Sequence, residues 1–127
     1  MSSASECVNL TRGRLVAGRV DRAFSLAGRM KGLLGRQALP PGQGLWLKPC
    51  RQVHTWFMRY PIDVVFLDAE LKVVAVQRRM RPWRVSPLFM RARSALELAA
   101  GRAEGVEAGD RLKIGPGGGP DSGGIAR

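Results

Sequence analysis

The run Ile-Asp-Val-Val-Phe-Leu at residues 62–67 constrains the fold more than any other stretch of the chain. After Asp63 it has no polar alternation, which predicts a strand that is buried on both faces. Residues 68–71 follow with the composition of a turn. Residues 71–80 then place valines on both faces of a second extended segment. The two runs together predict a hairpin near the centre of a strand-rich domain.

Short apolar runs separated by Gly and Pro predict further strands. They lie at residues 7–20, with a hairpin turn at Gly13, and at residues 45–48, 95–99 and 111–114. One segment differs, because Leu26, Met30, Leu33 and Leu34 recur at helical spacing and predict a helix over residues 23–34. The predicted fold class is α+β, mainly antiparallel β, with a curved sheet closing toward a barrel and one main short helix.

A length of 127 residues fits one domain. We predict a frayed N-terminus at residues 1–5, a single compact domain at 6–115 and a disordered Gly/Pro-rich tail at 116–127. The chain contains no run of 18 apolar residues, so no membrane helix is expected. The first residues lack the features of a signal peptide. The expected location is therefore cytoplasmic, and we expect Cys7 and Cys50 to be reduced thiols.

The formal net charge is +11, and only four of the 21 basic residues are lysines. A GC-rich genome produces such an arginine excess, so a solvated, codon-biased surface is one interpretation. The other is an anion-binding face. Its best candidate is the segment 78–93, where arginines alternate with aromatic residues that could stack on bases. No known nucleic-acid motif occurs, so we predict only non-specific nucleic-acid binding. The candidate anion-binding residues are Arg78, Arg79, Arg81, Trp83 and Arg84.

Residues 54–63 hold the only histidine and several polar residues within an apolar stretch. If this stretch is extended, alternate residues from position 54 to 58 share one face and could line a pocket. Core packing is the alternative interpretation, because aromatic and Met side chains in strands are usually buried. The candidate ligand-binding residues are His54, Trp56, Met58, Arg59, Asp63 and Trp46.

Asp63 enters an apolar strand, so its carboxylate needs hydrogen-bond donors. We expect it to accept amides from the loop around Pro61 or to pair with Arg59. The competing interpretation is a general base in a cleft. An enzyme would combine His54, Asp63 and Cys50, with Thr55 or Ser86 as other nucleophiles. None of these lies in a nucleophile-elbow context. We therefore favour a non-catalytic binding module with no catalytic residue, metal or cofactor, whose partner is an unknown small molecule or protein.

Several motifs occur in the order typical of one family. They lie at residues 32–36, 44–46, 54–59, 61–68, 96–98, 101 and 109–110. In this respect the chain resembles the domain-of-unknown-function 192 family, also called UPF 0127, over roughly residues 20 to 115. The resemblance implies a compact domain with a curved, barrel-like sheet and one main helix. It implies no activity. Many members have Trp-Met-Lys-Asn-Thr where this chain has Phe57-Met58-Arg59-Tyr60.

Overall fold

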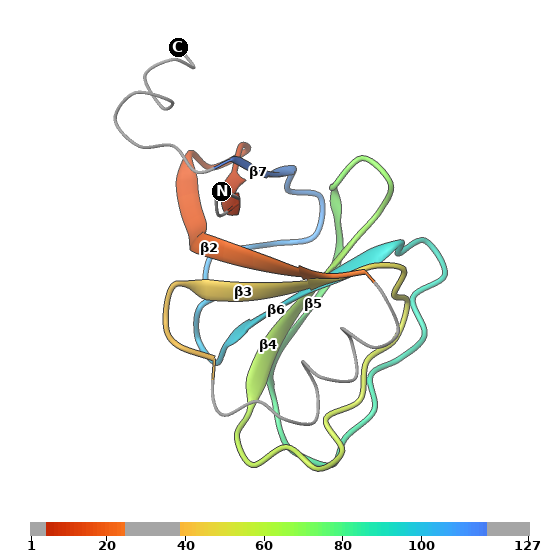
Figure 1. Cartoon of the computed structure of the whole chain (residues 1–127). Coiled ribbons are helices and arrows are strands. Elements are labelled where there is room, and N and C mark those ends of the chain that lie inside the picture. The colour runs from red at the N-terminus through yellow and green to blue at the C-terminus, as the bar shows by residue number, and fades with distance from the viewer. Residues whose placement is uncertain (1–4, 25–38, 117–127) are drawn as a thin grey trace.

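The computed structural model describes residues 5–24 and 39–116, which form one curled sheet of seven strands (Figure 1). The order across the sheet is β5-β4-β6-β3-β2-β1-β7. The strands are β1 (Ser5–Asn9), β2 (Arg14–Ala23), β3 (Gln43–Leu47), β4 (Ile62–Leu67), β5 (Val73–Met80), β6 (Ser94–Ala99) and β7 (Leu112–Pro116).

Both predicted hairpins are confirmed. β1 pairs with β2 across a turn in which Gly13 has a φ of 65°, a value that suits glycine. β4 pairs with β5, with Val65 opposite Val76. All neighbouring strands are antiparallel except β2 and β3, which run parallel, so the sheet is mixed.

The curl of the sheet brings its two edge strands together. Lys72 and Arg111, next to β5 and β7, form an isolated β-bridge. Beside it, the Val73 N–H donates to the Asp110 carbonyl at 2.7 Å, and the Leu112 N–H donates to the Leu71 carbonyl at 2.9 Å. Register shifts within β1–β2 and β4–β5 allow this curvature, because a bulge bends a strand and increases its twist. The sheet is therefore barrel-like, as predicted.

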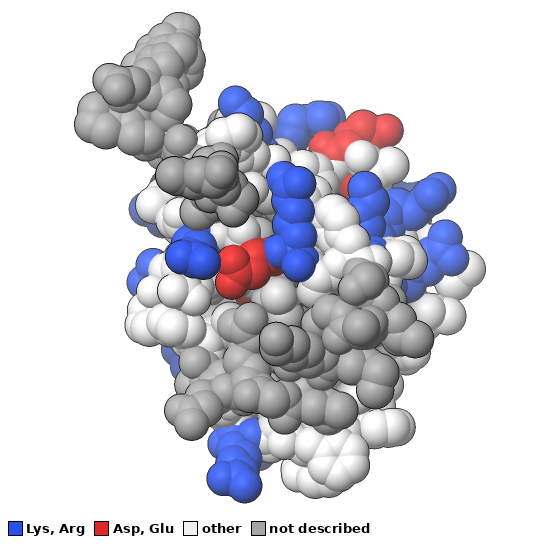
Figure 2. Space-filling view, in the orientation of Figure 1, with Lys and Arg blue, Asp and Glu red and all other residues white. Residues whose placement is uncertain are grey.

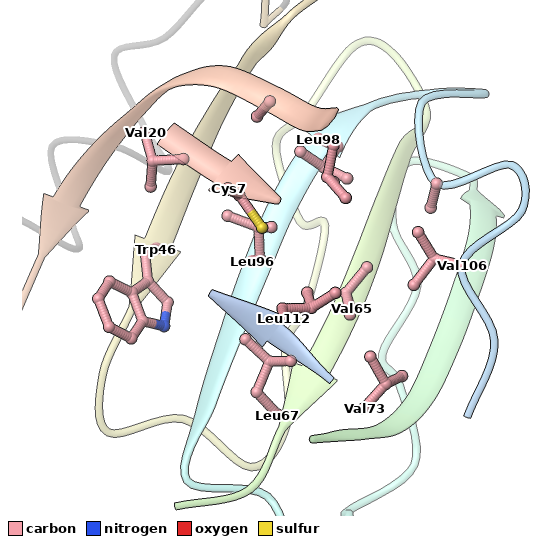
Figure 3. Close-up of a cluster of buried hydrophobic side chains, with 13 residues drawn as sticks. Cys7, Val20, Trp46, Val65, Leu67, Val73, Leu96, Leu98, Val106 and Leu112 are labelled. Carbon is pink, nitrogen blue, oxygen red and sulfur yellow. The ribbon is translucent and has the colours of Figure 1, made fainter. Parts of the chain in front are cut away.

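The core consists of two clusters, one on each face of the sheet. Every residue of β4 is buried, so its side chains alternate between the two clusters. Val65 and Leu67 join residues from β1, β2, β6 and β7 on the inner face of the curl (Figure 3). Ile62, Val64 and Phe66 lie on the outer face. There they pack against residues from the loops that follow β3 and β5. Those loops thus form part of the hydrophobic core.

The α+β prediction is wrong for the described residues, which contain no helix. Residues 21–23, expected near the start of the helix, instead extend β2, because Asp21, Arg22 and Ala23 pair with β3. Strand pairing therefore includes Ala23, the first residue of the predicted helix. The rest of the predicted helix, including Leu26, Met30, Leu33 and Leu34, lies outside the described residues. The described residues include no helix that could span a membrane.

Candidate functional site

Two loops that are far apart in sequence lie side by side, and they contain most of the predicted site residues. Residues 48–61 and 81–93 run together at the lower right of Figure 1. The Cys50 N–H donates to the Arg93 carbonyl at 3.0 Å, and the Thr55 N–H donates to the Arg84 carbonyl at 2.8 Å. The pairing is antiparallel, since the residue numbers rise in one loop and fall in the other. We call these segments the paired loops.

Thr55 is the main connection between the paired loops. The side chain is fully buried, and its hydroxyl accepts the Arg84 N–H at 2.9 Å and donates to the Arg81 carbonyl. Its own carbonyl accepts the N–H of Trp83 at 2.9 Å and that of Met58 at 3.2 Å. Thr55 therefore fixes residues 81–84 against residues 56–58. Sequence reasoning considered Thr55 only as a nucleophile, because the backbone groups it binds are up to 29 residues away.

The paired loops expose aromatic rings. The exposed fractions are 45% for Trp56, 66% for Phe57 and 57% for Trp83. The Phe57 and Trp83 rings are in contact, with centroids 4.8 Å apart, and Trp56 stacks on His54 at 4.5 Å. Phe57 and Trp83 both have positive φ values, which bulky residues rarely adopt. Backbone strain of this kind clusters at functional sites.

Apolar exposure is concentrated on the same loops. Six of the nine exposed large apolar side chains in the described residues belong to them. Val85 forms a β-bridge with His54, which places its backbone beside the His54–Trp56 stack. Exposed apolar side chains that lie together, as the contacting Phe57 and Trp83 rings do, mark candidate interaction sites. The six residues are Trp56, Phe57, Trp83, Val85, Leu88 and Met90.

The paired loops are also the most basic part of the chain. They carry seven basic residues and no acidic residue, whereas the rest of the chain has 14 basic and 10 acidic residues. On the face seen in Figure 2, Lys and Arg are spread out, with Asp and Glu among them. Codon bias accounts for arginines throughout the chain, but it does not account for the lack of acidic residues in these loops. The seven residues, all exposed, are Lys48, Arg51, Arg59, Arg81, Arg84, Arg91 and Arg93.

The candidate ligand-binding residues separate into a surface group and a buried group. His54, Trp56 and Arg59 reach the surface, while Met58 is buried against the outer core cluster. The expectation that residues 54–58 are extended, with alternate side chains on one face, is wrong. A turn closed by the Met58 N–H and the Thr55 carbonyl rotates Met58 inward.

Trp46 lies in β3, two residues before the paired loops begin at Lys48, at one side of the inner cluster (Figure 3). The residue is only 8% exposed, and the Phe24 ring contacts its ring edge-on at a centroid distance of 5.1 Å. The guanidinium of Arg22 and the ammonium of Lys48 lie 5.5 Å and 5.9 Å from the ring centroid. These contacts make Trp46 a core residue beneath a cationic surface, and none of them connects it to His54 or Trp56.

Asp63 is wholly buried and accepts three backbone amides. Its carboxylate binds the N–H groups of Arg79 at 2.8 Å, Gly101 at 3.0 Å and Ala103 at 2.8 Å. Asp63 accepts backbone amides, as expected, but the donors lie in β5 and in the turn after β6 rather than in the loop around Pro61. None of these bonds involves Arg59 or the loop around Pro61. A carboxylate held in this way ties three segments together and has no access to a substrate.

Cys50, His54 and Ser86, from the alternative catalytic set, each contact backbone groups of the paired loops. The Cys50 thiol is buried and donates to the Gln52 carbonyl at 3.3 Å. The Ser86 hydroxyl accepts the Val53 N–H at 3.0 Å and donates to the Pro87 carbonyl. His54 Nδ1 accepts the Trp56 N–H at 3.4 Å. These groups stabilise the loops.

The candidate anion-binding residues also divide into two groups. Arg78 donates to the Val106 carbonyl and lies 3.4 Å from the Glu107 carboxylate. The Arg79 guanidinium lies close to Gly101. Both residues belong to the region around the turn that follows β6. Only Arg81, Trp83 and Arg84 lie on the paired loops, where all three are exposed.

Comparison with known proteins identifies relatives but no activity. The model of a family described as Uncharacterized ACR (DUF192) matches residues 8–114. A UPF0127 protein of Thermococcus sibiricus is 34% identical over 85 residues, which are 61% of this chain and 52% of the relative. A UPF0127 protein of Pyrococcus horikoshii is 40% identical over 63 residues, which are 48% of this chain and 54% of the relative. The matched region thus spans about half the length of these curated relatives.

Two solved structures share the fold. One is a protein of unknown function from Novosphingobium aromaticivorans, with a TM-score of 0.72 and 21% identity, covering 87% of this chain and 83% of that one. The other comes from Sinorhizobium meliloti and is described as a "putative transcription regulator". It has a TM-score of 0.68 and 25% identity, and covers 90% of this chain and 96% of that one.

Proposed function

This chain belongs to the DUF192 family, and we propose that it is a non-catalytic binding module that holds single-stranded nucleic acid on its paired loops. The observation that carries the proposal is the combination of exposed rings with a local excess of positive charge. Trp56, Phe57 and Trp83 are exposed among seven arginine and lysine residues, with no acidic residue in either loop. Proteins that bind single strands without sequence preference combine a cationic surface with aromatic stacking platforms.

The shape of the surface favours single strands over duplexes. Sequence reading in the major groove requires a helix or a two-stranded ribbon that fits the groove. The paired loops offer neither, because Pro82 and Pro87 interrupt one loop and the Thr55–Met58 turn interrupts the other. Stacking on Trp83 or Phe57 needs a base that is already free of its neighbours. Binding is therefore expected to depend on chain length and salt rather than on sequence.

The description of the Sinorhizobium relative as a "putative transcription regulator" agrees in kind with a nucleic-acid ligand. A small-molecule pocket built from His54, Met58 and Asp63 has less support, because Met58 and Asp63 are buried and Asp63 is fully hydrogen-bonded. A protein partner would use the same apolar patch without needing the arginines. The experiment below separates that partner class from nucleic acid.

The test is fluorescence anisotropy with a labelled 12-nucleotide oligothymidine, repeated over a series of salt concentrations. We expect affinity to fall as salt rises, with a slope of about −0.7 for each phosphate contact. Trp83→Ala should weaken binding by about 1–3 kcal/mol, the usual contribution of one stacked base. Leu10→Ala removes an exposed apolar side chain outside the paired loops and should leave affinity unchanged. Salt-independent binding, equal losses in both variants or no binding would reject the proposal.

A further inference from the structure

A cavity of about 230 Å³ lies on a different part of the molecule, and no residue of the paired loops lines it. Its walls are the start of β2, with Arg14 and Val16, and the turn after β6, with Gly101, Arg102, Glu104 and Gly105. A water molecule occupies about 30 Å³ in the liquid, so the cavity has room for a small solute. It is smaller than the sites that take drug-sized ligands, about 300–1,000 Å³.

Hydrogen bonds fix the wall of the cavity that is formed by the turn after β6. Asp63 accepts the N–H groups of Gly101 and Ala103, and the turn closes on itself through the Val106 N–H and the Ala103 carbonyl at 3.0 Å. On the opposite wall, the buried Asn9 donates to Asp110 at 2.9 Å. These bonds fix both walls before any ligand arrives, which reduces the entropy lost on binding.

Gly105 allows an arginine to lie against the turn. It has a φ of +82°, and a Cβ built there would come within 3.2 Å of Arg14 Nη1. The Arg14 guanidinium therefore lies beside backbone that carries no side chain, at the edge of the cavity.

Arg14 and Arg102 differ from the other arginines nearby. Arg12 pairs with Asp110 at 2.7 Å, and Arg78 lies 3.4 Å from Glu107. Within residues 5–24 and 39–116, neither Arg14 nor Arg102 has a carboxylate within ion-pair distance. The cavity is thus lined by two uncompensated guanidinium groups and one carboxylate, that of Glu104.

We propose that this cavity binds a small oxyanion, with Arg14 and Arg102 as its charged donors. Guanidinium groups bind carboxylate and phosphate oxygens through paired N–H donors. The negative charge of Glu104 repels a dianion. It therefore lowers the affinity of the cavity for a dianion but does not abolish binding. A zwitterion would use Glu104 in the opposite way, as the partner of its cationic group, and this difference separates the two ligand classes.

The test uses inorganic phosphate as the probe and the full chain labelled with ¹⁵N. Chemical shifts of the Gly101 and Gly105 amides are followed during titration with phosphate, with chloride at matched ionic strength as the reference. We expect saturable shifts with phosphate and none with chloride. Arg14→Gln should weaken binding at least about tenfold, the effect of losing one charged donor. Arg19→Gln, on the same strand but outside the cavity, should bind phosphate like the parent.

Glu104→Gln provides the second readout. For an oxyanion it should tighten phosphate binding severalfold, because it removes the repelling charge. Glycine titrated as a zwitterion should not shift the same amides in the parent. The proposal is overturned if phosphate causes no saturable shift, if Arg14→Gln and Arg19→Gln bind alike, or if glycine binds and Glu104→Gln abolishes that binding.

Discussion

The carboxylate of Asp63 accepts the N–H of Ala103 at 2.8 Å, although the two residues are 40 positions apart in the chain. The same carboxylate binds the amides of Arg79 and Gly101. One buried side chain therefore fixes β4, the end of β5 and the turn after β6 relative to one another. The stability of all three segments depends on its charge and on its two acceptor oxygens.

Asp63→Asn should destabilise the protein strongly. An amide has one acceptor oxygen and a donor NH₂ group, so at least one of the three backbone donors loses its partner. The expected loss is about 2–4 kcal/mol of unfolding free energy, since a buried unsatisfied group costs roughly 1–3 kcal/mol and the charged bonds weaken as well. Urea unfolding measures it. Asp21→Asn, at a partly exposed position, is the control. Equal unfolding free energies for the parent and Asp63→Asn would contradict the assignment.

Stability should depend on pH through Asp110. The hydrogen bond from Arg12, followed by those from Glu107 N–H and Asn9, lowers the pKa of Asp110 from 3.8 to about 2. A carboxyl whose folded-state pKa is lowered contributes stability that is complete above its ordinary pKa and is lost as pH falls through the folded-state value. The unfolding free energy of the parent should therefore decrease between about pH 4 and pH 2.

The check is a series of urea unfolding curves across that pH range for the parent and Asp110→Asn. The variant lacks the titrating group, so its stability should change less over the same interval. It should also be less stable than the parent at pH 7. Parallel pH profiles for the two proteins would show that Asp110 does not contribute to the acid response.

Thr55→Val tests whether the paired loops act as a unit. Valine keeps the shape but removes the hydroxyl that binds Arg84 and Arg81, so the expected cost is about 1–2 kcal/mol. Amide hydrogen exchange should rise in residues 81–93 and stay unchanged in β4. Thr11→Val is a matched control, because the Thr11 hydroxyl accepts one backbone amide, from Arg111 at 2.8 Å, on an exposed turn. Faster exchange in the paired loops of both variants would count against a specific role for Thr55.

Phe57→Gly should separate stability from binding. Glycine adopts the positive φ of 68° without strain, and the lost ring is mostly exposed. The unfolding free energy should stay the same or rise by up to about 1 kcal/mol. Oligothymidine affinity should fall, because a stacking surface next to Trp83 disappears. At Leu10, an exposed residue with an ordinary backbone conformation, the same substitution should destabilise. A strongly destabilised Phe57→Gly variant would show that the ring supports the fold.

The features that sequence predicted correctly depend on local signals. The β4–β5 hairpin needs only an apolar run, a turn and a second run, and the β1–β2 turn needs only Gly13 between two strand-forming segments. The extension of β2 through Asp21 and Ala23 could not be predicted in this way. It depends on parallel pairing with β3, which lies some twenty residues further along the chain.

The candidate residues were found by composition, but their roles were set by contacts that no local pattern contains. Asp63 was identified correctly as a carboxylate in need of amides, yet its donors are 16, 38 and 40 residues away. Residues 54–59 and 81–84 were predicted as separate sites. The backbone bonds of Thr55 make them neighbours, and a single tight turn moves Met58 from the expected surface into the core.

The bridge between Lys72 and Arg111 has a consequence for solubility. An exposed sheet edge can recruit strands from other molecules and start aggregation. Here the two edge strands approach each other at the bridge, and charged side chains such as Arg78, Arg79 and Lys113 occupy the edges beyond it. The bridge and these charges oppose the recruitment of strands at the sheet edges, in a chain that exposes six large apolar side chains on its paired loops.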